Sequence, residues 1–511
     1  MPAPSEPEKY SIDDMMERLK SPPSENVIED GELVIRADGS QAIRVRKRKR
    51  RSQQPHKEAQ KQSRQRRMIQ VAAVLILVFV ALFGAGTALI WANSTPFREK
   101  LQREIARDSR ANVEMTQFRM NPNSANAAQL SFSWPEGNAL QSLTFGNIKA
   151  DISPSSFFGS SLAGDEVTCA EGILILRSPL PNQPSWIIPS SDISKPIHFN
   201  RYASPRTQVR LGNASSPLLL LRNSSASFYP SHASGRPQLL LDSGELTLNG
   251  YPKLRMDRAH LEFRGTEIDV VSLRLRHETD NQGVFELTGT LSPYAADSSP
   301  RLDIRLESFL LAGLVGPELG RLFSGRIDSR PDPKSNYLSF KSTPNPNALL
   351  SVAFSNSLAT AFEIKEFPFL FGLSQTLGDD WFERPVFEND VSGTVRRENG
   401  TVCISDLRCE AKSRMALRGT LTLTPDRKLS GNFNIGVTDA MILSAKSHHL
   451  DALFGPPTDG FRWLSLKIGG SAAVPSDNFK ELFLTTSLAP APTDPPPSNK
   501  IPSFEDLTNP K

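Results

Sequence analysis

The sequence predicts a mainly β protein that follows a single membrane-spanning helix. Three observations carry this prediction. The thirty residues between Arg67 and Arg98 contain no charged side chain, later segments alternate apolar and polar residues, and the 511-residue chain holds 40 Pro and 31 Gly. Alternation with a period of two is typical of strands with one buried face. Frequent Pro and Gly indicate a chain that turns often, as β architectures do.

The uncharged stretch predicts a transmembrane helix over residues 68–92. At a rise of 1.5 Å per residue, about 20 apolar residues cross the hydrocarbon layer of a bilayer. Twelve Lys and Arg residues stand between Arg44 and Arg67, with Glu58 as the only acid among them. Cationic flanks stay on the cytoplasmic side. We therefore expect residues 1–67 in the cytoplasm and the chain from residue 93 onward outside it.

Two alternatives to an uncleaved anchor exist, and we favour neither. A cleaved signal peptide has a short leader and an apolar run of roughly 7–15 residues, whereas this leader is 67 residues long. The buried helix of a soluble protein needs a neighbouring core on every face, which fits poorly with the adjacent run of cations.

The two ends of the chain predict little packed structure. Residues 1–67 are polar, charged and poor in aromatic residues, which indicates a disordered basic tail. Within it, residues 11–20 could form a short helix, with Ser11 as its N-cap. Residues 486–511 form a Pro-rich tail whose composition suits an extended spacer.

The segments beyond the anchor predict one helix and then many short strands. Residues 97–110 space Phe97, Leu101 and Ile105 by four, as a helix requires. Residues 302–306 and 433–437 alternate apolar and polar side chains. In residues 266–277 the apolar phase slips by one position, which is the pattern of a β-bulge.

A recurring sequence element places Gly between two apolar strand residues. It occurs around Gly289, Gly393 and Gly419, and in weaker form in residues 466–472. A strand whose apolar face carries a small residue at one point indicates a bent or closely covered sheet.

Two longer apolar stretches interrupt the strands, in residues 309–323 and 366–382. Pro317 suits the first turn of a short helix in the first of them. Either stretch could cap or line a groove. We favour the plainer interpretation that both cover an open sheet and close a core.

Composition and motifs exclude several classes of function. The net charge of +4 mostly reflects the cytoplasmic cations, so we expect no nucleic-acid partner. No nucleophile elbow, zinc-protease, phosphate-loop or dinucleotide motif occurs on suitable elements, so we expect no enzyme. We also expect no cofactor and no metal site. Asp379 and Asp380 as adjacent acids and His448 and His449 as an adjacent pair are typical of solvated surface residues.

The three cysteines do not form a disulfide framework. Cys403 and Cys409 lie six residues apart, too far along a straight strand for the Cα spacing of about 5.5 Å that a disulfide needs. They could pair only across a turn near Asp406, and the sequence leaves this open. Cys169 would then be the remaining thiol.

The order of these elements resembles the AsmA family of bacterial envelope proteins, whose pattern is an inner-membrane anchor, a polar helix and a succession of strands. The resemblance covers roughly residues 68–475 and rests on hydrophobic and glycine patterns. The matching segments are residues 112–118 (NVEMTQF), 143–152 (LTFGNIKADI), 161–167 (SLAGDEV), 172–176 (GILIL), 399–407 (NGTVCISDL), 417–423 (LRGTLTL) and 429–437 (LSGNFNIGV). Residues 180–235, rich in Pro and Ser, match nothing in this pattern.

The resemblance implies an elongated, curled antiparallel sheet over residues 93–485, a half-pipe groove with a few short helices. It implies a single-pass protein of the bacterial inner membrane whose bulk is periplasmic. Phospholipid would be bound or passed between membranes along the apolar inner face, or outer-membrane assembly would be assisted, with envelope proteins as further partners. The lipid-groove candidates are the apolar strand residues Ile268, Leu273, Leu275, Leu302, Ile304, Leu306, Leu421, Leu423, Phe433 and Ile435.

A second function fits nearly the same sequence. A single-span envelope scaffold would bind protein partners through a β domain whose inner face is packed closed. The two hypotheses differ in one structural property, which is whether the apolar inner face is open or filled.

Overall fold

The computed structural model describes residues 32–44, 54–138, 140–153, 162–177, 197–231, 235–265, 267–291, 300–331, 334–341, 347–357 and 360–488. The described chain is mainly β, with one large sheet and few helices. It divides into two compact units, Met1–Phe83 and Gly84–Lys511. The expected helix of residues 11–20 and most of the Pro-rich tail lie outside the described residues.

The first unit contains a short hairpin and most of a long helix. Strands β1 (Glu32–Ile35) and β2 (Gln41–Arg44) pair antiparallel, within a segment that the sequence predicted to be disordered. Helix α2 (Gln54–Ala92) runs for 39 residues. Its part Lys61–Ala92 contains an 18-residue window with a mean hydropathy of 2.7, and it is long and apolar enough to cross a membrane.

Helix α3 (Thr95–Ser109) confirms the helix expected over residues 97–110. Pro96 lies in its first turn, where a missing N–H costs nothing, and Arg110 ends the helix in a left-handed conformation with φ of 51°. Its apolar side, which includes Leu101 and Ile105, is buried against the first strands of the large sheet.

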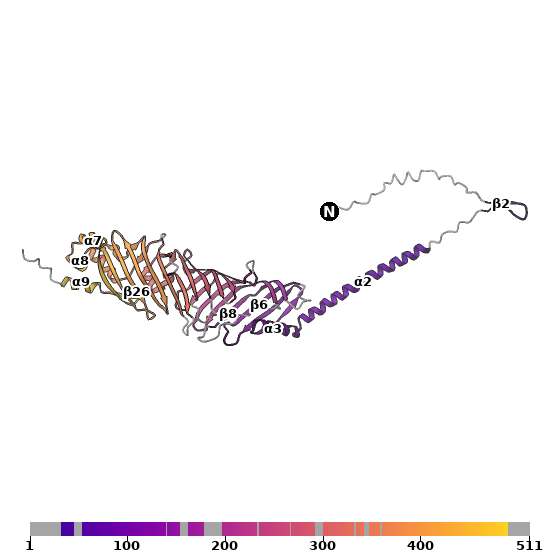
Figure 1. The fold of residues 1–511 in the computed structure, drawn as a ribbon, viewed down its shortest axis with the longest axis horizontal. Helices are drawn as coiled ribbons and strands as arrows, with labels where there is room; N and C mark the ends of the chain where they lie inside the picture. Colours follow the sequence, from indigo (N-terminus) through magenta and orange to yellow (C-terminus); the bar gives the residue numbers. More distant parts are fainter. Residues whose placement is uncertain are drawn as a thin grey trace, which may run out of the picture. The chain divides into compact units, whose positions relative to one another are not determined.

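The large sheet in the second unit is one curled succession of strands, which Figure 1 shows following one another nearly in chain order from purple to yellow. Its first strands are β3 (Asn112–Thr116), β4 (Arg119–Asn121), β5 (Ser124–Ser133), β6 (Leu140–Ile152), β7 (Leu162–Thr168), β8 (Glu171–Leu176), β9 (Ile197–Gly212), β10 (Pro217–Tyr229), β11 (Gln238–Asp242) and β12 (Glu245–Leu248). We call these strands the N-terminal region.

The remaining strands of this sheet form the C-terminal region. They are β13 (Leu254–Arg264), β14 (Glu267–His277), β15 (Val284–Leu291), β16 (Arg301–Glu307), β17 (Phe309–Leu310), β19 (Arg326–Ser329), β20 (Tyr337–Lys341), β21 (Asn347–Asn356), β24 (Asp390–Glu398), β25 (Thr401–Ala411), β26 (Met415–Leu423), β27 (Leu429–Thr438), β28 (Phe461–Gly470) and β29 (Pro475–Asp477).

At several positions two short strands take the place of one long strand. β7 and β8 both pair with β6 and with β9, and β11 and β12 both pair with β10 and with β13. The sequence did not predict these breaks. The resemblance implied an antiparallel sheet, and the described strands of the large sheet pair antiparallel except that β9 runs parallel to both β7 and β8. Strands β9 and β10 occupy much of the segment 180–235, which the sequence pattern could not place.

Buried and exposed side chains alternate, as expected, along strands where the sequence alternates apolar and polar residues. Along β16 the burial alternates strictly, with Leu302, Ile304 and Leu306 inside. The predicted bulge lies at Val271, because the pairing of β14 with β13 steps from Ser272 to Val270. Val271 is skipped by the register, and its side chain is 46% exposed while Val270 is buried.

The two apolar interruptions fold as short helices against the C-terminal region. The first gives α4 (Ala312–Val315) and α5 (Pro317–Leu322), with Pro317 in the first turn as predicted. The second gives α6 (Pro368–Leu377) and the 3₁₀ helix η2 (Asp380–Glu383). A small sheet of β18 (Phe323–Ser324), β22 (Phe362–Ile364) and β23 (Val386–Phe387) joins them, and α7 (Asp439–Ser444), α8 (His448–Leu453) and α9 (Phe479–Leu488) lie near the last strands.

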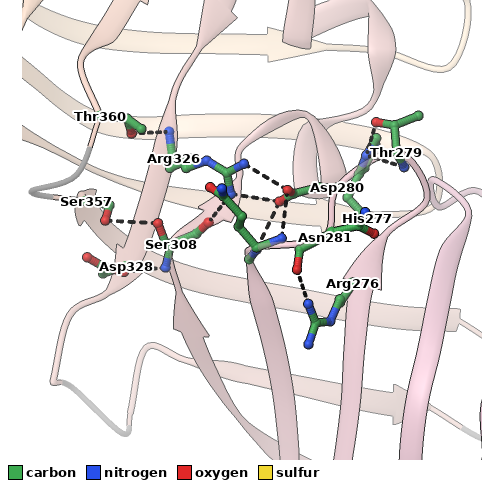
Figure 2. A network of polar contacts seen from close by, with 12 residues as sticks. Arg276, His277, Thr279, Asp280, Asn281, Ser308, Arg326, Asp328, Ser357 and Thr360 are labelled. Carbon is green, nitrogen blue, oxygen red and sulfur yellow. Dashed lines mark hydrogen bonds and ion pairs between the residues drawn. The ribbon is translucent and has the colours of Figure 1, made fainter.

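A buried ion pair joins three segments of the C-terminal region (Figure 2). Arg326 donates Nη1–H and Nη2–H to the two carboxylate oxygens of Asp280, each at 2.8 Å, and Nη1–H also reaches the carbonyl of Ser308. The amide of Gly283 donates to the same carboxylate at 3.1 Å. The guanidinium holds the pKa of the Asp280 carboxyl far below its usual value. The β14–β15 turn, the end of β16 and β19 are therefore fixed to one another.

Both outermost ends of the succession carry an asparagine amide. At one end, Asn93 donates Nδ2–H to the carbonyl of Met120 in β4 at 2.7 Å, and the amide of Met120 donates to Asn93 Oδ1 at 2.8 Å. At the other end, the amide of Lys467 in β28 donates to Asn478 Oδ1 at 2.8 Å. In each case a side chain bonds the backbone of one strand residue that a further strand could otherwise pair with, and β29 pairs with the last three residues of β28.

Candidate functional site: an apolar cavity

An apolar cavity of about 910 Å³ lies on the inner face of the N-terminal region. It extends from β5 to β11, with one residue of α3 at its edge. Its apolar lining consists of Ile105, Leu130, Phe132, Leu143, Phe145, Ile148, Val167, Leu174, Ile197, Phe199, Tyr202, Val209, Ala226, Phe228, Leu239 and Leu241, together with several small or polar residues. The volume falls in the upper part of the range of about 300–1,000 Å³ that small-molecule pockets occupy.

Strand alternation explains why these residues line the cavity. In β6, Leu143 and Phe145 point into it, and the intervening Thr144 therefore lies on the opposite face. The same period places Leu130 and Phe132 of the paired strand β5 beside them. The lining is thus the inward face of a sheet, and the described residues do not fill the space that this face encloses.

Aromatic rings of β9 and β10 form part of the wall, and Phe263 of β13 contacts Phe228 from outside the lining. The ring centroids of Phe199 and Tyr202 lie 6.1 Å apart, those of Tyr202 and Phe228 lie 6.2 Å apart, and Phe228 is 6.1 Å from Phe263. Edge-on and tilted contacts between aromatic rings contribute more stability than the burial of their apolar area alone. The wall therefore has a defined shape without needing an occupant to order it.

Among the described residues, the polar groups that line this cavity belong to Cys169, His198, Tyr202, Ser204, Thr207 and Ser231. The hydroxyl of Ser204 donates to the carbonyl of Arg206 at 3.0 Å, and the thiol of Cys169 to that of Ala203 at 3.7 Å. Burial raises the pKa of the Cys169 thiol and of the Tyr202 phenol, so both stay neutral at pH 7. Thr207 Oγ1 is buried without a hydrogen-bond partner.

The wall of the cavity is predominantly apolar, and His198 is the one imidazole among its described residues. A general base or nucleophile needs a partner that shifts its pKa toward the working pH, and the thiol and phenol in the wall are shifted away from it. Among the described residues no group of His, Cys, Asp and Glu is arranged to hold a metal ion. An apolar ligand is what the lining can accommodate.

The cavity lies between two packed clusters of side chains. On one side, Leu101, Ile105 and Phe199 belong to a cluster beneath α3. On the other side, Leu241 belongs to a much larger cluster that continues through the C-terminal region. Val209, Leu239 and Ala226 contact that larger cluster while lining the cavity. The cavity is therefore bounded at the point where the interior of the sheet becomes filled.

None of the ten sequence-predicted groove residues lines this cavity. Eight are buried in the larger cluster, namely Leu275, Leu302, Ile304, Leu306, Leu421, Leu423, Phe433 and Ile435. For these eight the expectation of an open lining is wrong, because α4–α6 and the facing strands fill the space opposite them. Leu273 is half-buried against the same cluster, and Ile268 is half-buried at the start of β14.

Sequence reasoning missed the actual lining for two different reasons. Residues 143–152 and 172–176 were recognised as strands, and their alternation could have supplied Leu143, Phe145 and Leu174 as candidates. The residues of β9 and β10 carried no such signal, because Arg, Ser and Pro interrupt the apolar positions of both strands.

The remaining polar candidates have structural roles. Asp379 caps η2 by accepting from the amide of Trp381 at 3.0 Å, and it forms an ion pair with Arg414. Cys403 and Cys409 are both free thiols. The register of β25 shifts between Ile404 and Leu407, so the two thiols are not brought together across a turn. The disulfide that the sequence left open does not form here.

Comparison with protein-family models, with curated proteins and with solved structures finds no match to this chain.

Proposed function

We propose that this protein is a membrane-anchored lipid-binding protein that holds the acyl part of a phospholipid in the apolar cavity. The observation that carries the proposal is the joint presence of a cavity of about 910 Å³ with an apolar wall and a helix of membrane-spanning length. The resemblance to AsmA proteins, with a place in the inner membrane and periplasm, remains part of this proposal.

The energetics favour such a ligand. Transfer of each CH₂ group from water to an apolar environment is favourable by about 0.8 kcal/mol. The wall has few groups left to hydrogen-bond a polar ligand, because Ser204 and Cys169 already donate to backbone carbonyls. A headgroup would remain outside this wall, because burying its charge without a partner is costly.

The extent of the cavity limits how lipid could be moved. A conduit along the whole sheet would need an open inner face in the C-terminal region, where residues such as Leu421, Phe433 and Ile435 are fully buried. The cavity instead suits a step in which one lipid is taken up and released, either in transfer between membranes or in outer-membrane assembly.

A second candidate function, the envelope scaffold, is favoured by the packed C-terminal region. The inner face of this region is filled, as we expect for a scaffold, whereas a conduit would need an open inner face. The two roles concern different parts of the same sheet, so a test must probe the cavity itself.

The test is photo-crosslinking in the full-length chain. A photoreactive phenylalanine analogue at Phe145 should capture phospholipid from vesicles containing the reconstituted protein, detected as an adduct by mass spectrometry. The same analogue at Thr144, the neighbouring residue of β6 on the other face, is the matched control and should capture little. Equal adduct yields at the two positions, or none at Phe145, would refute lipid binding in the cavity and leave the scaffold as the better explanation.

A further inference from the structure

Helix α3 follows the apolar helix in the sequence and contributes Ile105 to the cavity wall. Ala92, the last residue of α2, is buried in the cluster beneath α3, and the adjacent Asn93 is hydrogen-bonded to both backbone groups of Met120. The first strands of the sheet are thus attached directly to the end of the apolar helix. Thr95 begins α3 two residues later. If α2 crosses a membrane, α3 starts at that membrane's surface.

The two sides of α3 differ in chemistry. Leu101 and Ile105 are buried, and Ile105 contributes to the cavity wall. On the outer side, Lys100, Arg103 and Arg107 are exposed. We call these three residues the α3 cationic face. At 1.5 Å per residue the helix rises about 8 Å from Thr95 to Lys100 and about 18 Å to Arg107, so Lys100 is the cation of this face nearest the end of α2.

Glu99 is exposed on α3 as the cations are, whereas the other two acids of the helix, Glu104 and Asp108, are more buried than their basic neighbours. The side chain of Lys100 is 57% exposed, whereas its partner Glu104, at 4.0 Å, is 27% exposed. The side chain of Arg107 is 70% exposed, whereas Asp108, at 3.5 Å, is 19% exposed. The cations therefore project into solvent while their acidic partners are turned toward the protein. Exposed pairs of this kind bind weakly, which leaves the cations available to another anion.

We infer that the α3 cationic face binds the phosphates of anionic phospholipid at the surface of the membrane that α2 crosses, and that anionic phospholipid is accordingly the preferred occupant of the cavity. This inference rests on the proposed lipid-binding function. Lys and Arg beside an anionic bilayer are attracted to its surface within a Debye length of about 10 Å at 0.1 M salt. Because the same helix supplies Ile105 to the wall, headgroup attraction and the uptake of acyl chains occur next to each other.

The test uses the full-length chain with the photoreactive residue at Phe145, reconstituted in vesicles of mixed phosphatidylcholine and phosphatidylglycerol. The readout is the headgroup composition of the crosslinked lipid. At low salt we expect enrichment of phosphatidylglycerol over its bulk fraction, on the order of tenfold. The triple variant Lys100→Gln, Arg103→Gln and Arg107→Gln should return the composition to that of the bulk membrane.

The matched control also removes three positive charges, but from a part of the sequence far from α3. Lys412, Arg427 and Lys428 lie in the turns on either side of β26, and their side chains are 80%, 77% and 77% exposed. Substituting all three with Gln should leave the enrichment unchanged. Raising the salt concentration should lower the enrichment of the unsubstituted chain and of this control together.

The outcomes separate this inference from the proposed function. No adduct at Phe145 in any variant would overturn both. Adduct at bulk composition in the unsubstituted chain would overturn the headgroup preference alone, and the cavity would remain a lipid site. Equal loss of enrichment in both triple variants would also overturn it, because the effect would then follow net charge and not α3.

Discussion

The N-terminal and C-terminal regions of the sheet use the same strand pattern but enclose different interiors. In both, apolar residues alternate inward along the strands. In the N-terminal region the inner face borders a cavity. In the C-terminal region it meets α4, α5 and α6, whose Leu314, Leu319 and Phe369 are almost completely buried. The comparison shows that alternation sets which side chains face inward, while separate insertions decide whether the space opposite is filled.

The largest expected difference is in the response to loss of an aromatic ring. Phe369 in α6 is fully buried, so Phe369→Ala should lower the free energy of unfolding by about 3–5 kcal/mol. Phe145 faces an existing cavity and is half-buried, so Phe145→Ala should cost only about 1 kcal/mol, because fewer contacts are lost. Denaturant unfolding of both variants measures the difference. Equal losses would show that the two interiors are packed alike.

A smaller effect is expected at the ion pair of the C-terminal region (Figure 2). The side chains of Asp280 and Arg326 are 5% and 15% exposed, so Asp280→Asn removes the counter-charge of a largely buried guanidinium, at a cost of about 3 kcal/mol. Because the pKa of folded Asp280 lies below its usual value, this stabilisation is fully present above about pH 4. It is lost as the pH falls through the pKa of the folded state.

Unfolding of the Asp280→Asn variant as a function of pH checks this sign. The variant should be destabilised by a constant amount from about pH 5 to 8, and the gap from the unsubstituted chain should narrow only at lower pH. Asp303→Asn, at an exposed position of β16 whose side chain is 64% exposed, serves as the control and should change stability little. If the difference in the free energy of unfolding stays constant down to acidic pH, the ionised carboxylate of Asp280 is not the source of the stabilisation.

The smallest expected difference in stability is between substitutions at two glycines in strands. A Cβ added at Gly419 would lie 2.2 Å from the carbonyl oxygen of Asn432, so Gly419→Ala should destabilise by about 1–3 kcal/mol. A Cβ at Gly172, in the cavity wall, would meet its nearest atoms at 3.4 and 3.5 Å, which are ordinary contacts. Gly172→Ala should therefore be nearly neutral in thermal unfolding. A large loss at Gly172 would show that the cavity wall has no room.

Much of the fold was predictable because its signals are local. The apolar helix, α3, the alternation in β16 and the slip at Val271 each follow from a short run of residues. The Gly-containing strands were also interpreted correctly, since Gly393 and Gly419 are covered by Phe354 and Phe433. In each case the residues that decide the structure are close together in the sequence.

The candidate site was not predictable in the same way. Whether Ile304 faces a groove or a core depends on what lies opposite, and that is supplied by residues far along the chain, such as those of α5 and α6. The cavity needs the absence of such a filling beside β6, β9 and β10, and no local pattern encodes it. The parallel pairing of β9 is also a long-range choice, which left its residues unassigned.

The asparagine side chains at the two ends of the strand succession affect how separate molecules could associate. An unprotected terminal strand is a template on which another chain can grow into a fibre. Here the side chains of Asn93 and Asn478 already occupy backbone groups of β4 and β28. We therefore expect these two side chains to hinder the pairing of a second chain with the sheet at Met120 and Lys467.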